Sequence, residues 1–232
     1  MLGTITNTCA IIIGTLAGTI FHSGIKEKYR DALYVALGLV SLVVGMNASL
    51  VNYQKTPYPL LFIVSIAIGS LTGTIIDIDG RFNRLVNKFS KGRDNQKNLA
   101  DGLSTAILLY CIGPLSMLGP VISALQGDNT FLFTNSTLDL ISSTIFASTY
   151  GFGMVLAAPV LFLWQGMFYL VASVSSSAIS DELMTELLII GGMMITASAF
   201  ALLGIKNCKS LNMLPALIVP VIWFILKGLV GF

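Results

Sequence analysis

The chain from Thr130 to Ala178 reads TFLFTNSTLDLISSTIFASTY, then GFG, then MVLAAPVLFLWQGMFYLVASVSSSA, and its one charged side chain is Asp139. At about 1.5 Å per residue, a single helix of this length would extend roughly 73 Å, whereas crossing the hydrocarbon of a bilayer takes about 30 Å. The stretch therefore predicts two antiparallel membrane-spanning helices that turn at Gly151-Phe152-Gly153. Asp139 is then expected about 12 Å inside the first of them, where a carboxylate is costly to keep ionised, so it marks a candidate functional site.

The composition is that of a membrane protein. Of the 232 residues, 55% are hydrophobic and 10% are charged, and the mean hydropathy is +0.85. Soluble domains carry about 25% charged residues. The sequence therefore predicts an all-α, polytopic integral membrane helical bundle that forms a single transmembrane domain in the lipid bilayer. No basic region precedes the first apolar run, so we expect that run to be retained and not cleaved as a signal peptide.

Cysteine and histidine usage argues against several kinds of chemistry. Cys9, Cys111 and Cys208 are isolated, and His22 is the one histidine. This pattern favours neither a disulfide framework nor a metal site, and small packing residues are the better interpretation of the cysteines. We also find no nucleophile–base–acid set and no nucleotide-binding loop, so we expect no enzyme activity and no cofactor.

Three apolar segments precede the main polar region, at about Ile5–Phe21, Leu33–Val51 and Tyr58–Ile76. The first carries Gly14-x-x-x-Gly18 and the third carries Gly69-x-x-x-Gly73. Such spacings allow the backbone of another helix to approach closely. They predict close helix contacts, and they make a homodimer an expected assembly.

Residues 80 to 101 form the one sizeable polar segment and hold nearly half of the chain's 13 Lys and Arg residues. Apolar residues at helical spacing in its first half predict an amphipathic helix on the membrane surface. Because Lys and Arg are enriched in cytoplasmic loops, this segment and the Lys26–Arg30 loop are predicted to be cytoplasmic, with the N-terminus outside. We expect Arg81–Lys97 to contact anionic lipid headgroups and no nucleic acid. Asp77-x-Asp79 could hold a divalent cation, but beside a glycine and arginines it is more typical of a helix end.

The later segments complete a prediction of eight spans. The fourth, Leu103–Leu125, is interrupted by GPLSMLGP, in which Pro114 and Pro120 each remove a backbone donor. A seventh span is expected at about Leu187–Gly204 and an eighth at Met213–Val230. The distribution of Lys and Arg does not separate eight spans from seven. Helix length favours eight, and a re-entrant hairpin in place of one crossing stays open.

A weak internal repeat relates the two ends of the chain. Ile25–Gly38 and Ile179–Gly192 each contain a charged turn, an apolar run and a glycine at matching spacing. They predict inverted three-helix repeats, as in many transporters, although two unrelated hydrophobic helices would give the same pattern. On this interpretation residues 1–79 are the first three-helix unit, 80–101 a cytoplasmic linker, 102–153 a central pair with the broken helix, and 154–232 the second unit.

Asp139 is expected to share a helix face with hydroxyl groups, because Ser136, Ser142 and Ser143 lie three or four residues away. An ionised carboxylate among hydroxyl oxygens is typical of a proton or small-cation site. The alternative is a capping or interhelical hydrogen bond near the outer end of the span.

Other positions could line a cavity together with Asp139. Gly113 and Pro114 would free backbone carbonyls at membrane depth, unless they form only a structural kink. Gln165 lies mid-span, and Asn7 and Asn47 lie toward the outer ends of the first two spans. Such amides more often join helices than bind solutes, but together with Asp139 they could line one outward-facing cavity.

Short matching stretches run along nearly the whole chain, and in this order they resemble the bacterial membrane-protein family called domain of unknown function 554. The resemblance implies an integral inner-membrane protein of presumed transport type. Where the family is expected to have Lys-Ser before Leu-Asp, this chain has Asn135-Ser136, which puts an ion pair at Asp139 in doubt. The matching stretches are Gly3-x-x-x-Asn7 with Ile11–Gly14 and Gly18, Leu37–Leu39, Cys111-x-Gly113-Pro114 with Leu118-Gly119, Leu138-Asp139, Phe146–Ser148, Gln165-Gly166, Gly191-Gly192 and Asn212–Leu217.

Two hypotheses of function follow. The first is a transporter or channel for a small ion or solute, coupled to protons or cations, with its site where the broken fourth span meets Asp139. The second is a non-transporting membrane scaffold or regulatory partner that uses its glycine faces for association.

Overall fold

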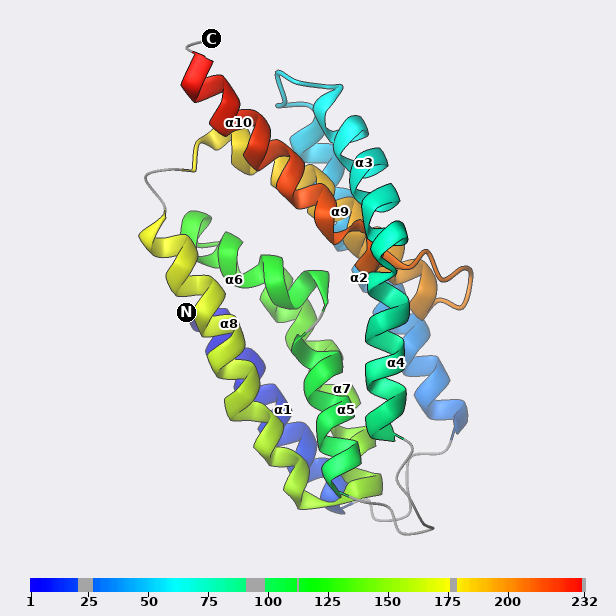
Figure 1. Ribbon diagram of the computed structural model, residues 1–232. Coiled ribbons are helices and arrows are strands. Elements are labelled where there is room, and N and C mark those ends of the chain that lie inside the picture. Colours follow the sequence, from blue (N-terminus) through cyan, green and yellow to red (C-terminus); the bar gives the residue numbers. More distant parts are fainter. Residues whose placement is uncertain (21–26, 91–98, 112, 176–178, 231–232) are drawn as a thin grey trace. The chain divides into compact units, whose positions relative to one another are not determined.

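A computed structural model describes residues 1–20, 27–90, 99–111, 113–175 and 179–230 of the chain. Every regular element in these ranges is helical, so the all-α fold predicted from the sequence is confirmed (Figure 1). His22, Lys26, Lys91, Arg93 and Lys97, on which parts of the topology prediction rest, lie outside the described residues.

The helices follow the apolar segments of the sequence closely. In chain order they are α1 (Leu2–Ile20), α2 (Glu27–Tyr53), α3 (Leu61–Ile76), α4 (Ile78–Ser90), α5 (Leu99–Cys111), α6 (Pro114–Gln126), α7 (Thr130–Tyr150), the 3-10 helix η1 (Phe152–Leu156), α8 (Ala157–Val174), α9 (Asp181–Leu202), the 3-10 helix η3 (Ser210–Leu217) and α10 (Ile218–Val230).

The count of eight spans is not confirmed. Among the described residues, five helices are long and apolar enough to cross a membrane, or up to six if the bent pair α3 and α4 counts as one span. The predicted fourth span is two helices of 13 residues each, α5 and α6, and a helix of that length covers only about 20 Å. The 21-residue α7 is long enough but is rich in Ser, Thr and Asn, which lowers its hydropathy.

The predicted turn between α7 and α8 is confirmed. Gly151 follows the last residue of α7 with φ of 84°, a left-handed conformation that glycine adopts without steric cost. The short helix η1 follows, and the chain returns along α8 (Figure 1).

Helices α3 and α4 are separated by one residue, Asp77, and are bent by 42°. Asp77 has a left-handed backbone, and its Oδ1 accepts a hydrogen bond from the backbone N–H of Gly80 at 3.2 Å. The predicted helix end at Asp77-x-Asp79 is therefore confirmed. The next helix, α4, is amphipathic, as its sequence predicts; its position on a membrane surface stays a prediction.

Contacts divide the chain into two compact units. The first contains residues 1–37 and 82–174, and the second contains residues 38–81 and 175–232. Each unit therefore combines segments from both halves of the chain. The division into 1–79, 80–101, 102–153 and 154–232, made in chain order, stays a prediction.

The first unit is organised around the contact between α1 and α7. A Cβ added to Gly14 would lie 2.1 Å from Ser143 Oγ and 2.3 Å from the Leu140 carbonyl oxygen, so the two backbones touch there. The N-terminal end of α1 is held by Asn129, whose Oδ1 accepts the Gly3 N–H at 3.1 Å. Buried apolar side chains of α1, α5, α7, η1 and α8 complete the core: Ile11, Ala106, Tyr110, Cys111, Ala147, Met154, Ala157, Ala158 and Leu161.

The second unit is built on two further close contacts. A Cβ on Gly73 would lie 1.9 Å from the carbonyl oxygen of Asn212 in η3, and one on Gly69 would lie 2.2 Å from Ala216 N. Helices α2 and α9 meet at Gly45 and Gly192, where each glycine faces the backbone of the other. Both predicted glycine faces, in α1 and in α3, are thus used inside the chain.

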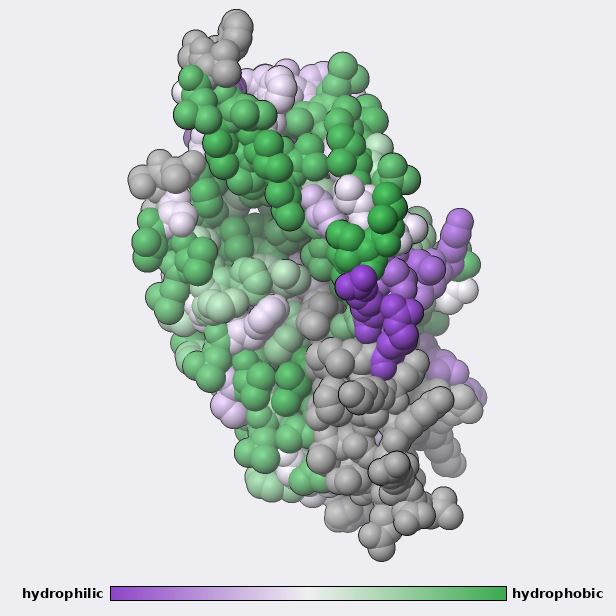
Figure 2. Space-filling view, viewed as in Figure 1, coloured by the Kyte–Doolittle hydropathy of each residue, from purple (hydrophilic) through white to green (hydrophobic). Residues whose placement is uncertain are grey.

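Large apolar side chains remain exposed in both units. Leu163 and Val174 of α8 are 71% and 83% exposed, and Leu229 of α10 is 78% exposed. Figure 2 shows apolar surface over these two helices. Exposed apolar surface of this extent is expected of helices that face lipid.

Candidate functional site

Asp139 lies in the middle of α7 and is 5% exposed. Its Oδ2 accepts a hydrogen bond from the side-chain amide of Asn135, one helical turn earlier, at 2.9 Å. Among the described residues this neutral amide is the one group that meets hydrogen-bond geometry with the carboxylate. The residue that replaces the expected lysine therefore still contacts Asp139, but it brings no positive charge.

Two of the three neighbouring serines donate to carbonyls of their own helix and not to the carboxylate. Ser136 Oγ donates to the Leu132 carbonyl at 2.7 Å, and Ser143 Oγ donates to the Leu140 carbonyl at 3.0 Å. Ser142 is half-buried. A helical serine readily bonds to a carbonyl of the preceding turn, which takes its hydrogen away from other acceptors.

Groups from two other helices, α1 and α5, lie near Asp139. Asn7 of α1 is fully buried, and its amide lies near the carboxylate. Neither Nδ2 nor Oδ1 of Asn7 meets hydrogen-bond geometry with any partner. Tyr110 and Cys111, at the end of α5, lie near enough to interact with the charge of Asp139. The hydroxyl of Tyr110 is also buried without a partner. The carboxylate therefore has neighbours on α1, α5 and α7 of the first unit. We call Asp139, Asn7, Asn135, Tyr110 and Cys111 the Asp139 cluster.

The chain is interrupted before α6 as the sequence predicts, but the Gly113 carbonyl is not free. Gly113 is the extended residue before the helix, Pro114 is its first residue, and the Gly113 carbonyl accepts from the N–H groups of Ser116 and Met117, both at 3.1 Å. Gln165 of α8 donates to Ser116 Oγ at 3.2 Å, while its Oε1 is buried without a partner. Gln165 therefore joins α8 to α6.

Asn47 belongs to the other unit. It lies on α2 within the second unit, and its side chain is exposed. A cavity lined by Asn7, Asn47 and Asp139 together stays a prediction.

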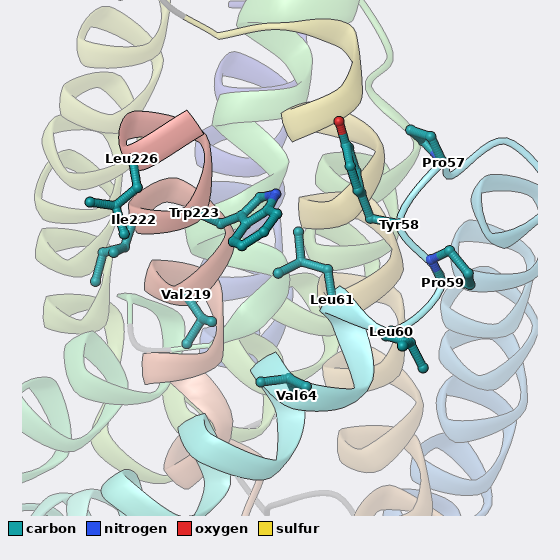
Figure 3. A pocket seen from close by; sticks show the side chains of 10 residues that line it. All are labelled: Pro57, Tyr58, Pro59, Leu60, Leu61, Val64, Val219, Ile222, Trp223 and Leu226. Atoms are coloured by element: carbon teal, nitrogen blue, oxygen red, sulfur yellow. The ribbon is translucent and has the colours of Figure 1, made fainter. Parts of the chain in front are cut away.

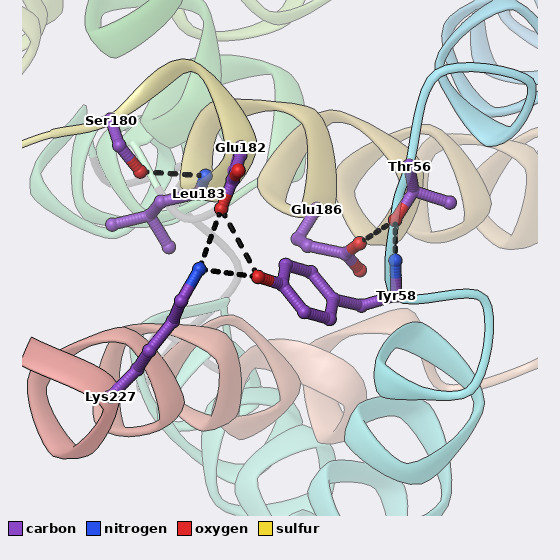
Figure 4. Close-up of polar contacts among 7 residues, drawn as sticks. All are labelled: Thr56, Tyr58, Ser180, Glu182, Leu183, Glu186 and Lys227. Atoms are coloured by element: carbon purple, nitrogen blue, oxygen red, sulfur yellow. Dashed lines mark hydrogen bonds and ion pairs between the residues drawn. The ribbon is translucent and has the colours of Figure 1, made fainter. Parts of the chain in front are cut away.

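A second polar cluster lies in the second unit and was missed by the sequence analysis. It consists of Thr56, Tyr58, Glu182, Glu186 and Lys227, which we call the Glu186 cluster (Figure 4). Lys227 Nζ lies 3.2 Å from Glu182 Oε2, and Thr56 Oγ1 donates to Glu186 Oε1. The signal available in the sequence was the spacing of the two glutamates, one helical turn apart, together with a lysine inside an apolar helix.

An apolar groove lies beside this second cluster. It encloses about 520 Å³ between the segment before α3, the first turn of α3 and one face of α10 (Figure 3). Its lining residues are Pro57, Tyr58, Pro59, Leu60, Leu61, Val64, Val219, Ile222, Trp223 and Leu226. Tyr58 belongs both to the groove and to the Glu186 cluster.

Comparison with known proteins places the chain in a family. Uncharacterized membrane protein YdfK of Bacillus subtilis (strain 168) is 53% identical over 220 residues, covering 95% of this chain and 94% of that protein. Uncharacterized protein YqgA of Escherichia coli (strain K12) is 24% identical over 225 residues, covering 94% of each. No solved structure matches. The model of the family described as "Protein of unknown function (DUF554)" matches residues 2–225, and the chain belongs to this family of membrane proteins.

Proposed function

We propose that the protein is a transporter or channel for a small ion or solute, coupled to protons or small cations, with Asp139 in its site. The observation that carries this proposal is a buried carboxylate with buried, unpartnered polar atoms of Asn7 and Tyr110 on neighbouring helices. A buried polar group without a hydrogen bond costs about 1–3 kcal/mol, so each one calls for an explanation, such as a bound ion or water.

The charge balance of the Asp139 cluster favours a positively charged ligand. Its neighbours Asn7, Asn135 and Tyr110 are neutral, and an ionised carboxylate in an apolar surrounding needs a compensating charge. A proton on Asp139, or a small cation held by the carboxylate with the Asn7 carbonyl oxygen and the Tyr110 hydroxyl, would supply that charge. Both would also give the unpartnered polar atoms a function in binding.

The proposed location is the bacterial cytoplasmic membrane, with the N-terminus outside. The two relatives are bacterial proteins, and the basic segments between the first spans favour a cytoplasmic position for α4. In that position the amphipathic α4 would contact anionic lipid headgroups.

An inverted repeat is part of this proposal, and two helix contacts support it. Gly45 meets Gly192 and Gly69 meets Ala216, and the residue numbers of both pairs differ by 147 (192 − 45 and 216 − 69). Helices α2 and α9 run antiparallel at the first contact, since Ser49 pairs with Ile189 while Gly45 faces Thr196. This register matches Gly192 to Gly45, whereas the sequence comparison of Ile25–Gly38 with Ile179–Gly192 matched Gly192 to Gly38. Inverted repeats of this kind occur in many transporters.

The alternative role as a scaffold has less support, as does a homodimer. Both were predicted from the glycine faces of α1 and α3. Those faces pack against α7 and η3 of the same chain, so they are not available to a second copy. A homodimer would need another surface.

The proposed site is tested by the substitution Asp139→Asn. We expect it to abolish cation-driven flux and to leave folding intact, because asparagine keeps an acceptor for the Asn135 amide but cannot take up a proton or carry a negative charge. The measurement is the fluorescence of a pH-sensitive dye inside proteoliposomes that receive a pH, Na⁺ or K⁺ gradient. Asn47→Ala, in the second unit, is the control and should transport as wild type does.

Unchanged flux in the Asp139→Asn protein would refute the assignment of the site. Absence of any proton, Na⁺ or K⁺ response in the wild-type protein would refute the cation-coupled mechanism.

A further inference from the structure

Glu186 is a second buried carboxylate, in the other unit from Asp139. It lies on α9, one turn after Glu182, and is 0% exposed. Its Oε1 accepts a hydrogen bond from Thr56, whereas Oε2 is buried and has no partner. Figure 4 shows the carboxylate turned toward the segment that carries Thr56 and Tyr58.

The segment before α3 is shaped to meet this carboxylate. Thr56 Oγ1 accepts the backbone N–H of Tyr58 at 2.9 Å, so the hydroxyl hydrogen is left to donate to Glu186. Pro57 and Pro59 flank Tyr58 and restrict φ on both sides of it. The segment therefore places one hydroxyl on Glu186 and the Tyr58 phenol on Glu182 in a fixed geometry.

The nearby positive charge, on Lys227, is already paired with another carboxylate. Lys227 Nζ donates to Glu182 at 3.2 Å and to the Tyr58 hydroxyl, and the Tyr58 hydroxyl lies 3.3 Å from Glu182. The ammonium group also lies 5.1 Å from the centre of the Tyr58 ring. Lys227 and Glu182 thus form a neutral pair within a closed triangle of contacts. The charge of Glu186 is not balanced by that pair.

We propose that Glu186 is a binding site for one positive charge, a proton or a small alkali cation, held at Oε2. A buried carboxylate either binds such a charge or remains at a high energetic cost, because it has left water without a compensating partner. This site is separate from the Asp139 cluster, because it lies in the second unit and shares no residue with that cluster. The titratable groups of the cluster around it are Glu182, Tyr58 and Lys227.

The test is thermal unfolding of the full-length protein in detergent, in two arms. The first varies NaCl or KCl at constant pH, with choline chloride holding the ionic strength; the second varies pH in choline chloride alone. A cation bound only by the folded state raises the unfolding temperature by about 5–10 °C at 100 times its Kd. A response to Na⁺ or K⁺ identifies an alkali cation as the ligand, and a response to pH alone identifies a proton.

In the Asp139→Asn background, where the other proposed cation site is removed, Glu186→Gln should abolish the response, since glutamine retains the size of glutamate and an acceptor for Thr56 but loses the charge. The matched control is Glu182→Gln, one turn away on the same helix, which breaks the Lys227 pair and should lower the unfolding temperature while the response persists. Asp139→Asn alone should keep the part of the response that belongs to Glu186, so failure of the Asp139 site and failure of this site are distinguishable.

A response that persists unchanged in Glu186→Gln in the Asp139→Asn background would overturn the proposal, as would a wild-type protein that responds to neither arm. If Glu186→Gln does not fold, Thr56→Val provides the test. Removing the one hydrogen bond to the carboxylate should shift the midpoint of the response by about tenfold in ligand concentration, because such a bond to a charged group is worth about a factor of ten. An unchanged midpoint in Thr56→Val would contradict the site.

Discussion

Gly14→Ala is expected to destabilise the first unit by about 3 kcal/mol, the upper end of the usual cost of overpacking. The added methyl group would lie 2.1 Å from Ser143 Oγ and 2.3 Å from the Leu140 carbonyl oxygen. The serine side chain can rotate, but the carbonyl belongs to the backbone of α7 and moves only if the two helices separate. We therefore expect the unfolding temperature in detergent to fall by roughly 6–12 °C.

Gly166→Ala provides the control in the same unit. Gly166 is also buried in the middle of a helix, yet the nearest atom to its added Cβ is Met1 Cε at 3.9 Å. Since alanine favours the helix over glycine by about 1 kcal/mol, this substitution should leave stability unchanged or raise it. Equal effects of the two substitutions would contradict the close α1–α7 contact.

Gly73→Ala should have an effect of similar size in the second unit. Its Cβ would meet the carbonyl oxygen of Asn212 at 1.9 Å and the carbonyl carbon at 2.7 Å, so η3 would have to move away from α3. Asn212 also accepts the backbone N–H of Asp79 through its side chain, at 2.8 Å. Displacement of η3 would then break the bond that holds the start of α4. We expect faster hydrogen exchange in peptides that cover Ser210–Leu217, together with a loss of about 3 kcal/mol in stability.

Gly228→Ala tests whether the effect is specific to the contact. Gly228 lies on α10 in the same unit, and nothing lies within 4 Å of an added Cβ. Hydrogen exchange of η3 in the Gly228→Ala protein should match that of the wild-type protein. Normal protection of η3 in the Gly73→Ala protein would show that the α3–η3 contact is looser than described.

The helices and their interruptions were predictable because their causes are local. Apolar runs determine where helices form in a membrane, and Pro114 and Gly151 interrupt them through their own backbone geometry. Pro120, which was also predicted to interrupt the fourth span, lies inside α6. The number of spans was harder to predict from the sequence. Length alone made α7 a span, and the same polar residues that form the candidate site reduce its hydropathy.

The candidate site was predicted in part. The burial of Asp139 and the presence of Asn7 nearby follow from the cost of polar groups among apolar ones. The role of the serines in the site stays a prediction: Ser136 and Ser143 donate to carbonyls of their own helix, and the sequence does not show this choice. Tyr110 and the Glu186 cluster were missed because their partners are far apart along the chain: Thr56 and Glu186 are separated by 130 residues.

By itself, the sequence determined that this is a helical membrane protein, where most of its helices begin and end, and that two glycine faces would meet another backbone closely. Only the tertiary structure decided which backbone each face meets: α7 for Gly14 and η3 for Gly73. It also decided which carboxylates are left with buried oxygens and no balancing charge. The physical reason is that hydropathy and backbone geometry act between neighbouring residues, whereas packing and charge balance depend on groups that come together only when the chain folds.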